Sequence, residues 1–479
     1  MKTIISILLF VSSLCYSQWQ ADIRLTNSLA HSEFSALAVS GTVVHVVWQD
    51  DRDGNYEIYY KRSANSGANW GSDTRLTNFT LNSMTPAIAV SGQSVHVVWM
   101  DFRDGNREIY YKLSTDGGSS WGTDVRLTNN SSLSQAPSVI VSGTAVHVVW
   151  DDYRDGNYEI YYKRSTDGGL SWGSDTRLTN YSAASNAPTI AVSGNNVHVV
   201  WVDERDGNPE IYYKRSSDGG LNWSTDTRLT NNISYSASSS ITVSAAMIHV
   251  VWEDKRDGGN AELYYKRSTD GGLNWGTDSR LTNNTANSEA PSAMASGMVI
   301  HIVWQDERDG NLEVYYKRST DGGVSWSADA RLTNNIHVSA QPSVAASGTI
   351  VHVIWEDTRD GDYEIYYKLD PTGNPVSINN ISSEIPDEFS LSQNYPNPFN
   401  PMTNIKFDVP ATPQSSGKEN VILKIYNVLG KEITTLVDKE LSPGTYEVNF
   451  DGTIYPSGIY YCRMSFGESA AVNKMILLK

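Results

Sequence analysis

Residues 19–369 repeat one pattern of apolar and polar positions. The string Val-His-Val-Val-Trp, or a close variant, marks seven copies, with histidines 51 or 52 residues apart at His45, His96, His147, His198, His249, His301 and His352. In the third copy, apolar and polar side chains alternate over 145–151 and 158–164, and shorter strands are predicted over 137–141 and 176–179. Four short strands per copy, repeated at this spacing, predict the blades of a β-propeller.

The two ends of the repeat array predict how the ring closes. The string Arg-Leu-Thr-Asn ends each copy, but its first occurrence, at 24–27, precedes the first full copy, and none follows the last. Because 19–27 matches 70–78, Trp19 supplies the turn tryptophan that the seventh copy lacks. We predict an all-β fold with a seven-bladed β-propeller over 18–370, closed by an N-terminal strand that removes an exposed sheet edge. Six full blades with two frayed ends are the alternative.

Charge and the apolar segments narrow the class of protein. The chain carries 54 acidic and 37 basic residues, a formal net charge of −17, which argues against a nucleic-acid partner. An apolar run from Ile4 to Leu14 predicts a signal peptide over 1–17, with lipidation of Cys15 as the alternative. No other segment is apolar and long enough to span a bilayer, so no transmembrane segment is expected in the mature chain. Cleavage leaves Cys462 alone, so no intramolecular disulfide is expected.

The turn between the third and fourth strands of most copies has the form Ser-x-Asp-x-Gly-x-x-Trp. Its aspartates are Asp116, Asp167, Asp218, Asp270 and Asp321, and Asn65 replaces them in the first copy. An Asp side chain accepts backbone N–H groups in a tight turn, and Gly118 permits a positive φ. These turns resemble the Asp-box, or BNR, repeats of sialidases and related propellers, over the whole array. The resemblance implies that they lie on the face away from the active site, and we interpret the aspartates as structural.

The same resemblance states what catalysis would need. Sialidases use three arginines on the substrate carboxylate, a tyrosine–glutamate nucleophile pair and an aspartate acid/base, all from different blades. Here the blades are nearly identical, and the Arg-Ile-Pro motif of the family is absent. We therefore predict no catalytic residues and a secreted or cell-surface binding scaffold for a glycan or a protein. A sialidase-like glycoside hydrolase (exo-α-sialidase) is the alternative, and a self-assembling surface-layer protein is a third hypothesis.

The loop after each Val-His-Val-Val-Trp strand reads Trp-x-Asp-x-Arg-Asp-Gly and carries most of the charge. Its arginines are Arg52, Arg103, Arg154, Arg205, Arg256, Arg308 and Arg359. Because structural roles recur with a repeat, we expect each arginine to pair with the equivalent of Asp50, Asp53 or Glu57, or with a neighbouring blade.

The alternative is that the arginines form a ligand-binding face. Selectivity would then come from the variable residue before each arginine: Asp51, Phe102, Tyr153, Glu204, Lys255, Glu307 and Thr358. The candidate ligand-binding residues are thus the seven arginines with Phe102 and Tyr153.

We predict neither a cofactor nor a metal ion, with calcium binding by the charged loops as the alternative. Asp-x-Arg-Asp-Gly-Asn is weakly similar to a calcium loop, but an arginine stands where a third oxygen ligand would help. Each repeated histidine lies mid-strand among valines, which favours a packed, hydrogen-bonded side chain over a metal ligand.

After the array, residues 371–388 read as a linker and 389–479 as a separate domain. Strands are predicted over 421–428, 432–437, 445–450, 459–466 and 472–478, as in a small immunoglobulin-like β-sandwich. The strings NYPNPFNP, IYNVLGKEI, LSPGTYEV, PSGIYYCRM and KMILLK resemble the type A C-terminal sorting domain of the type IX secretion system. The resemblance implies recognition by that machinery through 389–479, and a protein that is secreted or attached to the outer-membrane surface. An accessory immunoglobulin-like module is the alternative.

Overall fold

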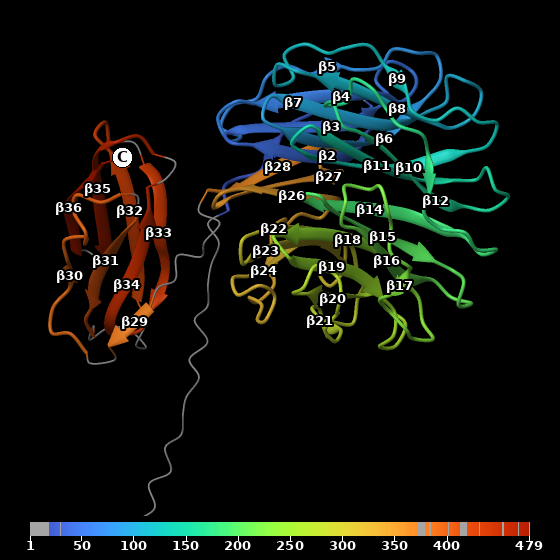
Figure 1. Cartoon of the computed structure of the whole chain (residues 1–479). Coiled ribbons are helices and arrows are strands. Elements are labelled where there is room, and N and C mark those ends of the chain that lie inside the picture. Colours follow the sequence, from blue (N-terminus) through green and yellow to red (C-terminus); the bar gives the residue numbers. More distant parts are fainter. Residues whose placement is uncertain are drawn as a thin grey trace, which may run out of the picture. The chain divides into compact units, whose positions relative to one another are not determined.

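The computed structural model describes residues 19–28, 30–371, 379–382, 385–400, 402–411, 419–430, 432–452, 455–467 and 469–478. The chain divides into two compact units, Gln20–Leu369 and a second one that contains Asp370–Lys479. We call them the repeat unit and the C-terminal unit (Figure 1). The predicted signal peptide and Cys15 lie outside the described residues. Within the described ranges, no helix is long and apolar enough to cross a membrane.

The repeat unit consists of antiparallel four-stranded sheets, one for each sequence copy. The first four are β2 (Ser32–Ser40), β3 (Val43–Asp50), β4 (Glu57–Ser63) and β5 (Thr74–Arg75); β6 (Ser83–Ser91), β7 (Ser94–Asp101), β8 (Glu108–Ser114) and β9 (Val125–Arg126); β10 (Ser134–Ser142), β11 (Ala145–Asp152), β12 (Glu159–Ser165) and β13 (Thr176–Arg177); and β14 (Ser185–Ser193), β15 (Asn196–Asp203), β16 (Glu210–Ser216) and β17 (Thr227–Arg228). The others are β18 (Ser236–Ser244), β19 (Met247–Asp254), β20 (Glu262–Ser268) and β21 (Ser279–Arg280); β22 (Ser288–Ser296), β23 (Val299–Asp306), β24 (Glu313–Ser319) and β25 (Ala330–Arg331); and β26 (Ser339–Ser347), β27 (Ile350–Asp357) and β28 (Glu364–Asp370), joined by β1 (Ile23–Arg24).

In the third copy, for which strand bounds were predicted, the first and fourth strands differ most from the prediction. In the third copy, the first strand runs over Ser134–Ser142 rather than 137–141, and its register shifts between Gln135 and Ser138. The shift is a β-bulge, in which Ala136 has a φ of 50°. The fourth strand is only Thr176–Arg177, because the chain then leaves the ladder.

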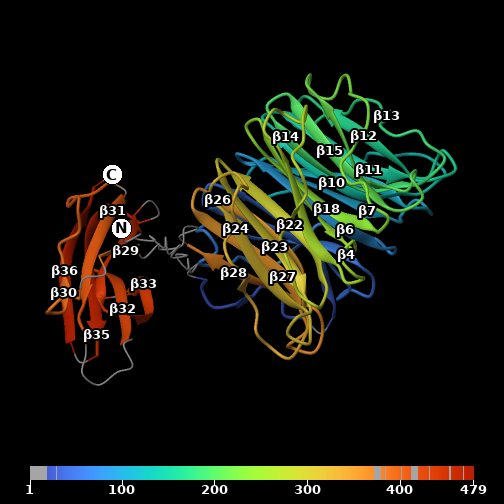
Figure 2. The same cartoon turned by 90° about the horizontal axis from the view of Figure 1, so that it is seen from below.

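The N-terminal strand completes the last sheet, as the sequence predicts. Ile23 pairs with Tyr367, and the backbone N–H of Leu25 donates to the carbonyl of Ile365 at 2.8 Å. Neighbouring sheets contact one another in chain order, and the last contacts the first through β26 and β2. The result is a closed ring of sheets that is consistent with a β-propeller (Figure 2). Trp19 is half-buried, and its role as the seventh turn tryptophan stays a prediction.

The hydrophobic core lies between neighbouring sheets. Trp99 of β7 is fully buried and packs in one cluster with Ile58 and Tyr60 of the preceding sheet. The turn tryptophan Trp121 adds to this cluster, with its ring edge-on to Tyr60 at 4.9 Å between centroids. The turn tryptophans therefore pack between neighbouring sheets and add to the hydrophobic core there.

The C-terminal unit is a sandwich of two four-stranded sheets around one core. One sheet has the order β29 (Asn379–Ser382), β34 (Gly444–Asp451), β31 (Met402–Val409) and β30 (Ser390–Leu391), and the other β33 (Glu432–Leu441), β32 (Glu419–Asn427), β35 (Gly458–Phe466) and β36 (Ser469–Leu477). Phe407, Leu423 and Met464 are buried between them. Strand β29 lies inside the segment predicted as a linker and pairs with β34, so that prediction was wrong at 379–382, where an edge strand carries little apolar pattern.

The Asn-Tyr-Pro-Asn-Pro-Phe motif anchors the end of the chain. The Asn397 side chain accepts the backbone N–H of Ile476 at 2.9 Å, and Phe399, which is buried, forms backbone hydrogen bonds with Ile476 and Leu478. Cys462 is free and buried, and burial raises the pKa of its thiol to about 12.

Candidate ligand-binding face

Two kinds of loop lie at opposite ends of every sheet. The loop at 51–56 joins β3 to β4, whereas the Asp-box turn follows β4 at Ser63, so the two lie at opposite ends of that strand. The segments that connect one sheet to the next lie at the same end of the sheets as the charged loops. For example, the Asn55 side chain donates to the backbone carbonyl of Leu81, in the connection to the second sheet, at 3.2 Å. We call this end of the repeat unit the loop face and the opposite end the Asp-box face.

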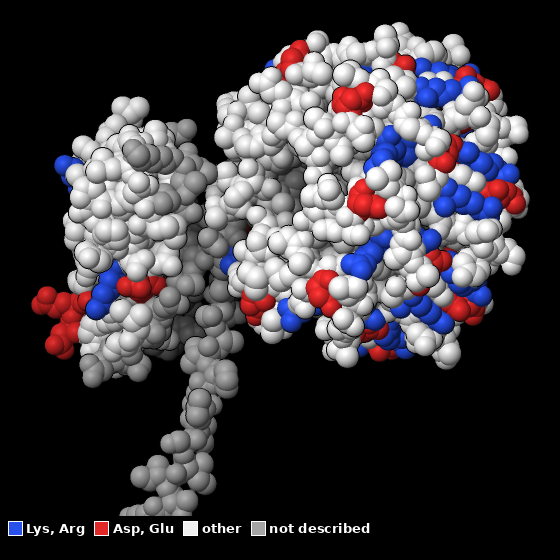
Figure 3. Space-filling model, in the orientation of Figure 1, with Lys and Arg blue, Asp and Glu red and all other residues white. Residues whose placement is uncertain are grey.

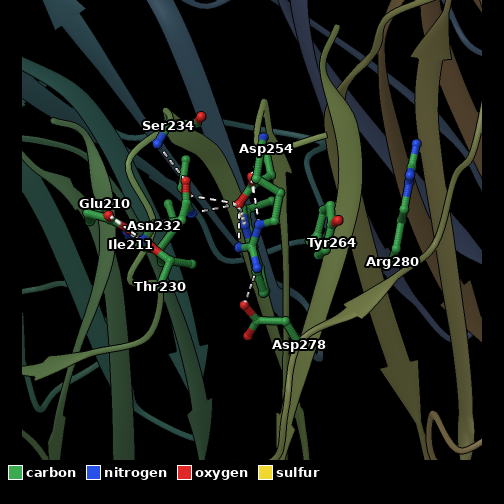
Figure 4. Close-up of polar contacts among 12 residues, drawn as sticks. Glu210, Ile211, Thr230, Asn232, Ser234, Asp254, Tyr264, Asp278 and Arg280 are labelled. Atoms are coloured by element: carbon green, nitrogen blue, oxygen red, sulfur yellow. Dashed lines mark hydrogen bonds and ion pairs between the residues drawn. The ribbon is translucent and has the colours of Figure 1, made fainter. Parts of the chain in front are cut away.

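The repeated arginine of the loop face is bound on both sides by carboxylates. Arg52 Nε donates to Asp50 Oδ1 at 2.7 Å, and Nη1 donates to Asp73 Oδ2 at 2.8 Å. Asp50 is fully buried and also accepts from Trp48 Nε1 and Ser32 Oγ. In the fifth copy, Asp254 and Asp278 both bind Arg256. Figure 4 shows these two aspartates and their dashed contacts.

All seven copies repeat this geometry. The partners of the seven arginines beyond their own loop are Asp73, Asp124, Asp175, Asp226, Asp278, Asp329 and, in the closing sheet, Asp22. Of the three predicted partners, the equivalent of Asp50 is the one that binds. Asp53 and Glu57 instead bind Arg75 of the Arg-Leu-Thr-Asn string, at 3.0 and 2.9 Å.

Hydrogen bonds between each repeated arginine and its carboxylate partners stabilise the charged forms of both groups. Burial alone would lower the pKa of Arg52, but hydrogen bonds to Asp50 and Asp73 outweigh it and raise that pKa. Burial alone would raise the pKa of Asp50, yet the hydrogen bonds from Arg52 and Trp48 lower it. In Figure 3, basic and acidic side chains of the repeat unit lie side by side. The guanidinium groups are thus already neutralised by the protein's own carboxylates.

Each repeated arginine lies over a tyrosine ring of its own sheet, and two of the arginines are covered by a second aromatic side chain. Phe79 lies over the Arg103 guanidinium at 3.5 Å, and Tyr181 lies over that of Arg205 at 3.4 Å. These two arginine side chains are 11% and 10% exposed, against 24% for Arg52. Phe79 and Tyr181 themselves remain 42% and 48% exposed. Stacking therefore leaves an open aromatic face above each guanidinium.

The variable residues before the arginines also reach the surface of the loop face. Tyr153 is 42% exposed and lies edge-on to Tyr158 at 5.0 Å. Phe102 is half-buried beside Arg107, at 5.5 Å. Glu204 is exposed, and Asp51, Lys255, Glu307 and Thr358 are half-buried. These positions differ from sheet to sheet, unlike the arginines.

A second set of variable positions was missed by the sequence reasoning. The residue after each buried tryptophan is Gln49, Met100, Asp151, Val202, Glu253, Gln305 or Glu356. Four of them accept the backbone N–H of the bulge residue in the next sheet: Gln49 from Thr85, Glu253 from Ala290, Gln305 from Gln341 and Glu356 from Phe34. Burial raises the pKa of Asp151 to about 7 and that of Glu356 to about 8. The sequence did contain a signal for these positions, because they vary from copy to copy while the residues around them in the same strand repeat.

On the loop face, two tyrosines each donate a hydrogen bond to a different glutamate. Tyr56 donates to Glu33 at 3.2 Å, and Tyr235 donates to Glu253 at 2.9 Å. Burial and the neighbouring Glu33 raise the pKa of Tyr56 to about 12. Neither pair recurs in every sheet, so these are asymmetric features of the loop face.

On the Asp-box face, the aspartates serve their own turns. Asp116 Oδ1 accepts the backbone N–H groups of Ser119 and Ser120 at 2.9 and 2.8 Å, and Ser114 donates to it at 2.8 Å. These hydrogen bonds from Ser120 and Ser114 lower the pKa of Asp116. Gly118 has a φ of 82°, and a Cβ there would collide with Tyr60 of the preceding sheet. Asp167, Asp218, Asp270 and Asp321 accept equivalent bonds.

The repeated histidines are packed and hydrogen-bonded, as predicted. His45 is 1% exposed, and its Nδ1 lies 2.7 Å from the hydroxyl oxygen of Tyr60. Burial lowers the pKa of His45 to about 4. Within the described part of the chain, no group of three or more His, Cys, Asp or Glu is placed to hold a metal ion.

Comparison with known proteins defines the C-terminal unit first. Residues 393–478 match the secretion system C-terminal sorting domain, so the chain carries this domain, and the protein is secreted or attached to the cell surface. No curated protein matches the chain.

Several solved structures are similar to the chain at low identity, and sialidases are among them. A protein of unknown function from Dyadobacter fermentans is 12% identical, with a TM-score of 0.49 over 74% of this chain and 99% of that one. The polysaccharide lyase Uly1 is 10% identical, with a TM-score of 0.49 over 74% and 99%. Trypanosoma rangeli sialidase is 11% identical, with a TM-score of 0.43 over 93% and 85%.

Proposed function

We propose that this protein is a secreted or cell-surface scaffold whose seven-bladed propeller binds a glycan or a protein through its loop face without catalysing a reaction. In this proposal the signal peptide directs export of the chain, and the type IX secretion machinery then recognises the C-terminal unit, an immunoglobulin-like sandwich. The sheet order and the closing strand β1 support seven blades, and the matched sorting domain supports this export route.

The observation that carries the non-catalytic role is the state of the arginines. A sialidase must offer free guanidinium groups to the substrate carboxylate. Here each repeated arginine already binds two carboxylates, as Arg52 binds Asp50 and Asp73. Releasing one would leave a buried Asp50 unpaired, which costs several kcal/mol, on the order of 3–5. The candidate face therefore offers its variable side chains, rather than its arginines, to a ligand.

One observation favours the sialidase-like alternative. Tyr56 and Glu33 form a tyrosine–glutamate pair on the loop face, the residue types that sialidases use as nucleophile and base. The pair therefore deserves a direct assay.

The test is release of 4-methylumbelliferone from its α-sialoside by the purified full chain, with Tyr56→Phe as a paired variant and an active sialidase as positive control. The proposal expects no release above buffer from either form. Release that Tyr56→Phe abolishes would establish the hydrolase and reject the scaffold. A glycan array screened with the same protein identifies the ligand that the scaffold hypothesis requires.

A further inference from the structure

At two variable positions of the loop face, aromatic side chains occur only between residues 79 and 181. Phe79 leads into the second sheet, Phe102 follows β7 of that sheet, Tyr153 belongs to the third, and Tyr181 leads into the fourth. Tyr56 and Tyr235 also lie on the loop face, at other positions. The positions equivalent to Phe79 and Tyr181 in the other sheets hold Ser28, Asn130, Asn232, Asn284 and Asn335. Those equivalent to Phe102 and Tyr153 hold Asp51, Glu204, Lys255, Glu307 and Thr358. The sector is therefore a departure from the repeat, and we call it the aromatic sector.

Two rings of this sector are held in fixed orientation before any ligand arrives. The Arg103 guanidinium lies between Phe79, at 3.5 Å, and Tyr110, at 4.2 Å. Asp101 and Asp124 fix that guanidinium from its edges, at 2.6 and 2.7 Å. Tyr181, Arg205 and Tyr212 repeat the arrangement at 3.4 and 4.3 Å. One face of Phe79 or Tyr181 is thus committed to the guanidinium, and binding to the open face costs little side-chain entropy.

The chemistry of the sector selects an uncharged ligand with flat apolar faces. The two repeated arginines that carry the stacked rings, Arg103 and Arg205, already bind carboxylates of the protein itself, and Arg107 beside Phe102 donates to Gln135. Acidic side chains elsewhere on the loop face, such as Glu204 and Glu307, repel an anionic chain. The sugar ring of a neutral glycan presents C–H groups that stack on an aromatic face, and its hydroxyls find partners in the polar connections around the rings.

The same observations disfavour a protein partner. Protein interfaces rely on a contiguous buried core with aromatic and arginine anchors. In this sector Phe79 and Tyr181 lead into the second and fourth sheets, the equivalent position of the third sheet holds the polar Asn130, and Arg103 and Arg205 are already bound by carboxylates.

We propose that Phe79, Phe102, Tyr153 and Tyr181 form a binding surface for a neutral polysaccharide, with sugar rings stacked on the open faces of Phe79 and Tyr181. This inference rests on the proposed binding function and names its ligand class and sector.

The experiment is affinity gel electrophoresis of the full chain through gels containing laminarin, xyloglucan or galactomannan as neutral probes, and alginate or polysialic acid as anionic ones. We expect retardation by at least one neutral probe. Phe79→Ala, Tyr153→Ala and Tyr181→Ala should each weaken that binding at least tenfold, whereas Tyr181→Phe, which keeps the ring, should stay within twofold.

Two controls isolate the sector. Leu170→Ala removes an apolar side chain that is 77% exposed on the Asp-box face, and Thr358→Ala truncates the position equivalent to Phe102 in the last sheet. Both should bind like the unmodified protein. Because Phe79→Ala uncovers Arg103, thermal unfolding is measured beside it, and Tyr153→Ala, whose ring covers no arginine, keeps the test valid if Phe79→Ala fails to fold.

Each other result has a distinct meaning. Binding of alginate or polysialic acid alone, or equal binding by the aromatic variants and Leu170→Ala, overturns this inference and leaves the scaffold function standing. Retention of no polysaccharide, with a protein partner lost in the same variants, overturns it in favour of a protein surface. Retention with cleavage of the neutral probe supports the surface and rejects the non-catalytic proposal.

Discussion

The buried histidines predict a steep loss of stability in mild acid. Seven histidines occupy one repeated position, and burial lowers the pKa of His45, His96, His147, His198 and His249 to about 4 and that of His301 and His352 to about 3. In the unfolded chain a histidine titrates near 6.5. The unfolded state therefore binds more protons than the folded state below about pH 6.5, so stability falls as the pH falls.

The magnitude follows from these values. Between pH 7 and pH 5, each histidine costs somewhat under 2 kcal/mol, or about 13 kcal/mol for all seven. Asp151 and Glu356 act in the opposite direction, because their raised pKa values make the folded state bind protons in this window. Together they return about 5 kcal/mol. The net loss of about 8 kcal/mol is comparable to the whole stability of an ordinary domain.

Urea unfolding at a series of pH values, followed by tryptophan fluorescence, measures this loss. Of the 14 tryptophans, 13 lie between residues 48 and 355, so the signal reports mainly the repeat unit. His45→Gln should reduce the pH dependence by about one proton, while Leu170→Ala, at an exposed position with no titratable group, should leave it unchanged. A repeat unit that loses less than about 2 kcal/mol between pH 7 and pH 5, or equal slopes for the two variants, would refute the reasoning.

Three further predictions concern the joints between sheets. Met100→Gln gives the bulge residue Ala136 the acceptor that Gln49 gives Thr85, so it should raise the free energy of unfolding by about 1 kcal/mol, and Gln49→Met should lower it similarly, both by urea titration. Glu356→Gln keeps an acceptor for Phe34 but cannot ionise; since burial raises the pKa of Glu356 to about 8, the variant should gain roughly 3–5 kcal/mol over the unmodified protein at pH 9 and little at pH 4, and a pH-independent difference would contradict this. Gly118→Ala should disrupt the packing between the first and second sheets, because its Cβ would collide with Tyr60. Gly105→Ala is also at positive φ but has open space around its Cβ, so it should lower the free energy of unfolding by only about 1–2 kcal/mol, as measured by calorimetry.

The sequence repeat predicted what the copies share. The strands around His45 and Trp48, the pairing of Arg52 with Asp50 and the closing strand at Ile23 all follow from periodicity and from the missing pieces at the array ends. Contacts between copies were harder, because they join residues that no local pattern connects. The bond from Thr85 to Gln49 spans 36 residues. Within one copy, the partner Asp73 of Arg52 was not predicted either.

The candidate site was predicted only in outline. The sequence places Phe102 and Tyr153 at variable loop positions, and the structure leaves both at the surface of the loop face. It could not reveal that Phe79 and Tyr181 stack on arginines of the following sheet, since this depends on how consecutive sheets pack. Whether the loop face binds a ligand stays a prediction.

The closed ring is tested most directly by hydrogen exchange, followed by mass spectrometry of peptides covering 20–27 and 173–180 in the unmodified protein. The Leu25 N–H donates to Ile365, and the Leu178 N–H donates to Ile160, each at 2.8 Å. The account predicts that both peptides exchange slowly and at similar rates. Rapid exchange of 20–27 beside a protected 173–180 would mean that the N-terminal strand does not close the last sheet.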